Sequence, residues 1–322
     1  MTGGADGEAA REQIGAAVDL GSTSVHLLVA RVVEHRVEPL IDESLFLGLG
    51  AAVEAAGLLG SPGRVGLGAA LAEYARRARE AGAGAITFVG TEPLRRLADA
   101  ARIAADVETA SGVPLHVLSH EEEGFLTLVG VTEGRPVEHD VLVVDIGGGS
   151  SEFVSVGPGR RAAANGVQVG AARLVRGHVS SDPPTLGELA ALRAAAAQAV
   201  ATAPISRPAE VILVGGTASN LLKIVPDGRL TRRLTTADLS TAFDVVAGHS
   251  SAALVERFLV RPARARILGA GAAIVEAIMQ RYGVDEIRVA DGGVREGTVV
   301  AVAHAGGRWR DRLEELAHGW VV

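Results

Sequence analysis

Two stretches of the chain place an aspartate between an apolar run and a turn of small, hydroxyl-bearing residues. Residues 14–29 read IGAAVDLGSTSVHLLV, and residues 141–156 read VLVVDIGGGSSEFVSV. Glycine turns expose backbone N–H groups, and such groups beside hydroxyls form a nest that binds anions such as phosphate. We predict that each stretch is a hairpin whose turn holds phosphate, while a plain hairpin with a flexible turn is the alternative for either one alone. The predicted phosphate-binding residues are Gly21, Ser22, Thr23 and Ser24 in the first stretch and Gly147, Gly148, Gly149, Ser150 and Ser151 in the second.

Carboxylates stand at matching places in the two stretches. Asp19 and Asp145 each end an apolar strand, and Glu152 follows Asp145 across the predicted hairpin. Buried carboxylates are costly without a partner, and Mg²⁺ or Mn²⁺ is a hard cation that prefers oxygen ligands. The repetition predicts two related lobes that face one anionic ligand, with Asp19 and Asp145 suited to a divalent metal and Glu152 able to approach Asp145 at the same end of the site. A carboxylate that caps a turn, or a cross-strand surface residue in the case of Glu152, is the alternative.

Several other residues could act on a phosphate group. One glutamate of the run at 121–123 could be a general base, although such a run is more often a solvated helix start and spacing does not select among the three. Arg95 and Arg295 could bind phosphate, and so could Arg96 by the same criterion. Gly216 and Thr217 follow a strand and open a helix, which presents N–H groups to phosphate. Walker and GxGxxG patterns are absent, which disfavours P-loop and Rossmann proteins.

Composition limits the classes of protein. The chain has 322 residues, no cysteine and a net charge of −7. The length suits two domains, and the negative charge argues against general binding to nucleic acid or a membrane surface. The polar N-terminus carries no signal sequence, so we predict a cytoplasmic protein.

The positioning elements are those of an α/β protein with a repeated opening. Three strands are expected over residues 14–46, then a helix from about residue 67 after a glycine-rich break, a strand at 85–89, and one helix from Pro93 to about residue 111. A second three-strand opening starts at residue 141. The glycine and proline at 134–136 suggest a boundary, so that the predicted parts are a disordered leader at 1–13, an N-terminal lobe at 14–134 and a C-terminal lobe at 135–322.

Six blocks, in this order, closely resemble the exopolyphosphatase and guanosine pentaphosphate phosphohydrolase (Ppx/GppA) family. The resemblance extends over about residues 14–305, and the DIGGGSSE block with its upstream partner is its most specific part. The blocks are VDLGSTSVHLLVARV (18–32), GTEPLRRLADA (90–100), EEEGFLTLVGV (121–131), VVDIGGGSSEFV (143–154), VGGTASNL (214–221) and ADGGVREG (290–297).

The resemblance implies two ribonuclease-H-like lobes of the actin, Hsp70 and sugar-kinase superfold, with the active site in the cleft between them. It implies that Glu123 is the catalytic base, that Arg95 binds phosphate, and that Asp145 and Glu152 position the metal and water. A homodimer is also implied. The expected reaction is metal-assisted release of the terminal phosphate of polyphosphate. Removal of a phosphate from guanosine pentaphosphate, or a nucleotide sensor with little turnover, are the alternatives.

The chain departs from the family pattern near the predicted base. Gly124 stands in place of the usual alanine, His120 in place of a glycine, and Glu92-Pro93 follows Thr91. We also expect a short member of the family, without the C-terminal HD-type domain that its long members carry.

Overall fold

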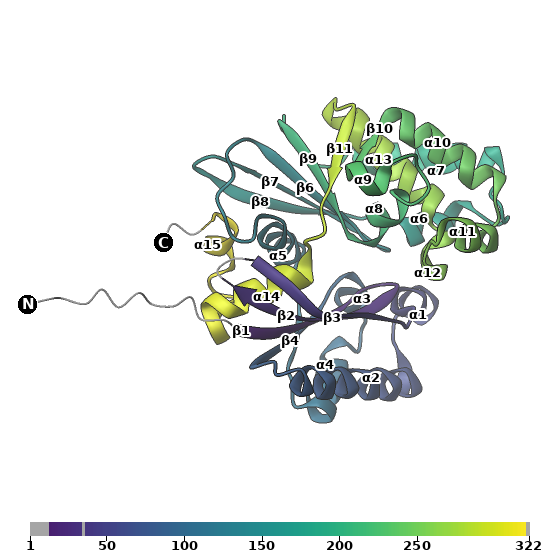
Figure 1. Cartoon of the computed structure of the whole chain (residues 1–322). Coiled ribbons are helices and arrows are strands. Elements are labelled where there is room, and N and C mark those ends of the chain that lie inside the picture. The colour runs from purple at the N-terminus through teal and green to yellow at the C-terminus, as the bar shows by residue number, and fades with distance from the viewer. Residues whose placement is uncertain (1–12, 34–35, 320–322) are drawn as a thin grey trace, which may run out of the picture.

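The structure is a computed structural model that describes residues 13–33 and 36–319 (Figure 1). The predicted leader at 1–13 lies outside the described residues, except for Gln13, which begins the first strand. None of the described helices has the length and apolar character needed to cross a membrane.

The first sheet has five strands in the order β3-β2-β1-β4-β5. β1, β2 and β3 are antiparallel neighbours, whereas β4 and β5 run parallel to β1. Residues 16–18 and 27–30 of the central strands are buried, since helical side chains such as Leu71 cover one face of this part of the sheet and Val299 covers the other. The strands are β1 (Gln13–Leu20), β2 (Ser24–Val33), β3 (Arg36–Phe46), β4 (Ala85–Gly90) and β5 (Leu115–Val117).

The second sheet repeats this plan with one added strand. Its order is β10-β11-β9-β6-β7-β8, in which β6, β7 and β8 are antiparallel and β9 runs parallel to β6. The predicted three-strand opening of each half is therefore confirmed. The strands are β6 (Val141–Ile146), β7 (Ser151–Gly157), β8 (Arg160–Val167), β9 (Glu210–Val214), β10 (Arg233–Thr235) and β11 (Glu286–Val289).

Helices pack on the two sheets and complete two hydrophobic cores. On the first sheet, Leu67, Leu71 and Tyr74 form a buried helical stripe, as their spacing predicts. The helices of the first half are α1 (Leu49–Ala56), α2 (Gly60–Glu80), α3 (Glu92–Arg96), α4 (Ala100–Ser111) and α5 (His120–Thr132). Those of the second are α6 (Ala171–His178), α7 (Leu186–Val200), α8 (Gly215–Leu221), α9 (Gly228–Thr231), α10 (Thr236–Gly248), α11 (Ser251–Phe258), α12 (Pro262–Ala265), α13 (Leu268–Tyr282), α14 (Val294–Ala305) and α15 (Leu313–Ala317).

Two helices cross between the sheets. α5 packs against β7 and β8 of the second sheet, whereas α14 packs against β1 and β2 of the first (Figure 1). Their backbones approach so closely that a Cβ atom at Gly130 would lie 2.2 Å from the Gly293 carbonyl oxygen. Each half of the chain thus supplies a helix to the other sheet. The predicted boundary between an N-terminal lobe at 14–134 and a C-terminal lobe at 135–322 stays a prediction.

Two expectations about helices were wrong. The helix expected from residue 93 to residue 111 is interrupted, because Leu97 is extended and buried while the Asp99 side chain accepts a hydrogen bond from the Leu59 N–H group. The glycine-rich segment before residue 67 contains α1 and the start of α2. Pro62 is tolerated there because residues in the first turn of a helix lack a partner for their N–H groups.

Candidate active site

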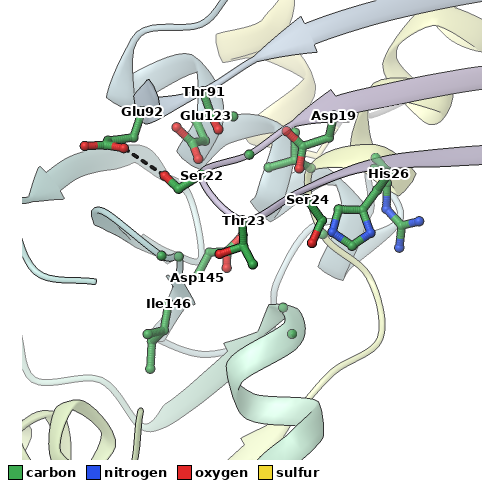
Figure 2. Close-up of a pocket in the computed structure, with 18 of the residues that line it drawn as sticks. Asp19, Ser22, Thr23, Ser24, His26, Thr91, Glu92, Glu123, Asp145 and Ile146 are labelled. Atoms are coloured by element: carbon green, nitrogen blue, oxygen red, sulfur yellow. Dashed lines mark hydrogen bonds between the residues drawn. The ribbon is translucent and has the colours of Figure 1, made fainter. Parts of the chain in front are cut away.

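A cavity of about 140 Å³ lies between the two predicted turns (Figure 2). The first turn (residues 21–24) joins β1 to β2, and the second turn (residues 147–150) joins β6 to β7. Both turns line the cavity, together with six acidic residues and two arginines. These are Asp19, Glu92, Glu123, Asp145, Asp291, Glu296, Arg264 and Arg295.

The hairpin register places each aspartate opposite a different partner. Asp19 pairs with His26 across β1 and β2, and Asp145 pairs with Glu152 across β6 and β7. The duplication that the sequence predicted therefore extends to the register, but not to the residue type across the strand.

The two aspartates are suited to a cation. The Asp19 Oδ1 atom is buried, and it accepts no hydrogen bond from the described residues. Burial, followed by repulsion from Asp145, raises the pKa of Asp19 to about 7. Burial also raises the pKa of Asp145 to about 6, although Arg264 opposes the shift. A divalent cation would remove this unfavourable excess of negative charge, so the residues fit a hard metal ion.

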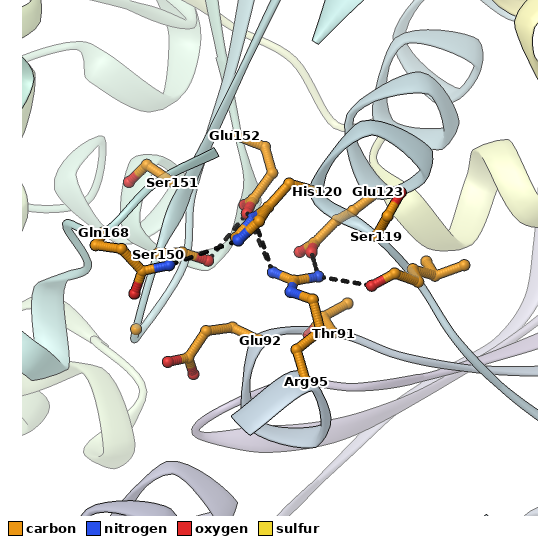
Figure 3. A network of polar contacts seen from close by, with 12 residues as sticks. Thr91, Glu92, Arg95, Ser119, His120, Glu123, Ser150, Ser151, Glu152 and Gln168 are labelled. Atoms are coloured by element: carbon orange, nitrogen blue, oxygen red, sulfur yellow. Dashed lines mark hydrogen bonds and ion pairs between the residues drawn. The ribbon is translucent and has the colours of Figure 1, made fainter. Parts of the chain in front are cut away.

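A second acidic group surrounds Arg95 (Figure 3). The guanidinium donates hydrogen bonds to Glu123 Oε2 at 2.6 Å and to the Leu118 carbonyl oxygen at 3.0 Å, and it lies 3.5 Å from Glu152 Oε1. The ring nitrogen Nδ1 of His120 lies 2.8 Å from Glu152 Oε1. One guanidinium thus links both predicted catalytic glutamates.

Both glutamates hold protons more tightly than free carboxyls do. Burial, then repulsion from Asp145, raises the pKa of Glu152 to about 8. Burial, then repulsion from Glu152, raises the pKa of Glu123 well above its usual range. The positive charge of Arg95 favours the ionised form of each glutamate and so opposes both shifts. Both pKa values stay raised, because this one charge is shared between two buried carboxyls.

A possible metal site of mixed ligands lies in the same group. Donor atoms of His120, Glu123 and Glu152 all lie within 4.8 Å of one another, which makes this the candidate group among the described residues. It differs from the predicted set of Asp19, Asp145 and Glu152, since only Glu152 is common to both.

Four predicted residues are not part of the cavity wall. Arg95 and Glu152 lie behind Glu123, as described above. The Ser151 hydroxyl donates to the Val169 carbonyl oxygen, and the Thr217 hydroxyl donates to that of Ile146. The roles of these four in binding phosphate or metal stay predictions. The predicted residues that line the cavity are Asp19, Gly21, Ser22, Thr23, Ser24, Glu123, Asp145, Gly147, Gly148, Gly149, Ser150, Gly216 and Arg295.

The sequence assigned no site role to several residues of the cavity wall, among them Arg264, His26, Glu92, Asp291 and Glu296. Arg264 comes from α12, and its guanidinium forms no ion pair or hydrogen bond within the part of the chain that the structure describes. It stands in an arginine-rich segment, where nothing in the sequence distinguishes it from its neighbours. His26 also received no role from the sequence, and burial followed by the charge of Arg295 lowers its pKa to about 3. Glu92 follows Thr91 in a departure from the family pattern, which was its one signal.

Comparisons with known proteins agree with the resemblance. The model of the Ppx/GppA phosphatase family matches residues 28–305. Exopolyphosphatase 2 of Mycobacterium tuberculosis is 27% identical over 89% of this chain and 98% of its own length. Exopolyphosphatase 1 of the same organism is 26% identical over 88% of this chain and 86% of its own length. The crystal structure of the Aquifex aeolicus member of the Ppx/GppA protein family has a TM-score of 0.78 and 25% identity, and covers 91% of this chain and 98% of that one. The predicted actin-like arrangement of two α/β lobes is confirmed.

Proposed function

The chain belongs to the Ppx/GppA phosphatase family, and from this premise we propose that it is an exopolyphosphatase. The reaction is hydrolysis of the terminal phosphoanhydride bond of polyphosphate, which releases one phosphate. The observation that carries the proposal is the buried carboxyl of Glu123, which faces a cavity walled by two glycine- and hydroxyl-rich turns.

The two turns and the unpaired arginine account for binding. The N–H groups and hydroxyls of both turns hold the oxygens of the terminal phosphoryl group. Arg264 faces the same space and forms no direct ion pair within the described residues, so its guanidinium, which favours the charged form of Asp145, can also contact the substrate. Fixed donors of this kind stabilise the charge that develops on the phosphoryl oxygens, and most of the rate increase comes from such positioning.

Glu123 accounts for activation of water. Burial raises its pKa and so makes it a stronger base than a free carboxylate, while Arg95 favours its charged form. The same guanidinium fixes the direction of the carboxylate through the 2.6 Å hydrogen bond. Glu123 therefore orients the attacking water and accepts its proton, while Arg95 acts as a positioning residue in this structure.

A divalent metal fits the acidic residues of the cavity. Mg²⁺ or Mn²⁺ would be held by Asp19 and Asp145. Glu152, which pairs with Asp145 across β6 and β7, would be the third ligand. When bound, it would offset the negative charge of the phosphates. The support is the buried, unpartnered oxygen of Asp19 beside a second carboxyl with a raised pKa.

One observation favours guanosine pentaphosphate as a second candidate substrate. A neighbouring cavity of about 660 Å³ shares Ser24, His26 and Arg264 with the first and is walled beyond them by Phe46 and Pro262. Apolar and aromatic walls suit a nucleobase rather than a chain of phosphates. Long polyphosphate gains less from such walls, so the preference between the two substrates depends on this second cavity.

Phosphate release distinguishes these possibilities. We would measure it with short polyphosphate, long polyphosphate, guanosine pentaphosphate and ATP, each with and without Mg²⁺. The proposal predicts metal-dependent release from polyphosphate. A higher kcat/KM for guanosine pentaphosphate would favour the second candidate, and no release from any substrate would favour a nucleotide sensor with this fold. The predicted homodimer and cytoplasmic location stay predictions.

A further inference from the structure

A carboxylate occupies an unexpected place among the groups proposed to hold phosphate. Glu92, the first residue of α3, is 4% exposed and lines the cavity beside both turns. An ionised carboxylate repels phosphate, so its neighbours must explain its presence.

The partners of Glu92 come from both halves of the molecule. The Ser22 hydroxyl of the first turn donates to Glu92 Oε2 at 2.8 Å. Arg173, on α6 of the second half, donates from Nη2 to Glu92 Oε1 at 2.7 Å. The Nε–H group of Arg173 also donates to the carbonyl oxygen of Gly149 in the second turn, at 2.8 Å. Glu92 is therefore bonded to the first turn directly and to the second turn through one guanidinium.

The two turns touch each other at this place. A Cβ atom on Gly149 would lie 2.3 Å from Glu92 Oε2, and a Cβ atom on Gly148 would lie 3.0 Å from Thr23 Oγ1. The absence of side chains at these two positions lets the second turn approach the first. The contact brings the two turns together beside Glu92.

Weaker ion pairs surround the central one. Arg96 lies 2.9 Å from Glu92, and Glu54 of α1 lies 3.6 Å from Arg173 and 3.5 Å from Arg176. The side chains of Arg96, Glu54 and Arg176 are each about a third exposed. Solvent therefore screens their ion pairs more than it screens the pair between Glu92 and Arg173. The Glu92–Arg173 pair is less exposed than these outer pairs, and with the contact between Arg95 and Glu152 it is one of two largely buried ion pairs that link the halves at the site.

We infer that Glu92 and Arg173 form an interlobe lock that fixes the spacing of the two phosphate-binding turns and closes the cavity at one end. The inference rests on the proposed function for its consequence. With this end closed, a phosphate chain must extend past Ser24 and Arg264 into the neighbouring cavity, so only the end of a chain enters. Glu92 and Arg173 are positioning residues, because they act through Ser22 and the Gly149 carbonyl.

The absence of cysteine allows a direct test of the lock. Spin labels at R102C on α4 and Q198C on α7, both exposed, report the distance between the halves by pulsed electron paramagnetic resonance. In the labelled protein without substrate, R173Q should broaden and lengthen the distance distribution. R96Q is the matched control, since it removes an ion pair to the same carboxylate from within α3 and should leave the distribution unchanged.

Kinetics give the second readout. Loss of the buried pair in R173Q should raise the KM for tripolyphosphate at least about tenfold, with a smaller change in kcat, whereas R96Q and the wild type should agree. R173K, which keeps the charge, should recover part of the affinity. An unchanged distance distribution in R173Q, or an equal effect of R96Q, would overturn the lock. If the wild type releases no phosphate, the proposed function fails while the distance result still decides on the lock.

Discussion

The two hairpins that form the cavity have the same frame and different chemistry. Asp19 and Asp145 end matching strands, yet the residue across the strand is His26 in the first hairpin and Glu152 in the second. The pKa of His26 is lowered to about 3 and that of Glu152 is raised to about 8, so both side chains tend to be neutral when buried. Above about pH 8, Glu152 therefore gains a negative charge, whereas the imidazole of His26 stays neutral.

The difference at this one cross-strand position separates two tasks. Near the first hairpin, Arg295 and Arg264 supply positive charge beside a neutral imidazole, which suits binding of phosphate oxygens. Near the second hairpin, Glu152 adds a second carboxyl beside Glu123, and Arg95 connects the two. A duplicated frame can therefore hold an anion from one side and activate water from the other.

Glu123→Gln should have the largest effect, because it removes the base on the side of the second hairpin. We expect turnover to fall roughly 10²- to 10⁴-fold while substrate binding is largely retained, since the amide keeps the shape but accepts no proton. Steady-state phosphate release and equilibrium binding measure the two effects. Glu121→Gln on the same helix is the control, because Glu121 is exposed and outside the cavity, and it should leave turnover unchanged. Wild-type turnover in Glu123→Gln would contradict the assignment of the base.

Stability without metal should fall as the pH rises. The folded state raises the pKa of Asp19 to about 7, of Asp145 to about 6 and of Glu152 to about 8, so it holds protons that the unfolded chain releases above about pH 4. These groups contribute stability that is fully present below about pH 4 and is lost progressively as the pH rises from there through their folded pKa values of about 6 to 8. For Asp19 alone the whole loss is on the order of 4 kcal/mol. Thermal unfolding in a chelator from about pH 4 to above pH 8 measures it, and added Mg²⁺ should reduce the slope.

Asp19→Asn sharpens this measurement on the first hairpin. The variant removes one buried charge, so at pH 8 without metal its Tm should exceed that of the wild type by roughly 2–4 °C, with a shallower dependence on pH. Asp244→Asn, at an exposed position away from the cavity, should leave both quantities unchanged. An unchanged pH dependence in Asp19→Asn would show that the carboxyl of Asp19 is ionised at no cost in the folded state.

The sequence predicted the frame better than the contacts between its parts. The matching positions of Asp19 and Asp145 follow from local strand and turn patterns, so the duplicated hairpins could be read from the residues alone. Arg264 reaches the cavity only because α12 packs beside α8, and the Glu92–Arg173 pair joins residues 81 positions apart. No local pattern encodes such contacts, and the exchange of α5 and α14 between the sheets has the same origin.

The smallest effect we predict concerns how tightly each crossing helix lies against its hairpin. A Cβ atom on Gly124 of α5 would lie 2.8 Å from both Ala164 Cβ and Val154 Cγ2, whereas one on Gly15 of β1 would lie 3.2 Å from Val299 Cγ1 of α14.

Gly124→Ala restores the residue that is usual in the family, and alanine favours a helix by about 1 kcal/mol. The clash with β7 and β8 should nevertheless outweigh this gain and destabilise the protein by a net of about 1 kcal/mol, with a several-fold loss of kcat because Glu123 moves relative to Glu152. Gly15→Ala should change the free energy of unfolding less and leave kcat unchanged, as measured by denaturant unfolding and phosphate release. If Gly124→Ala is as stable and as active as the wild type, the close contact of α5 does not set the position of the base.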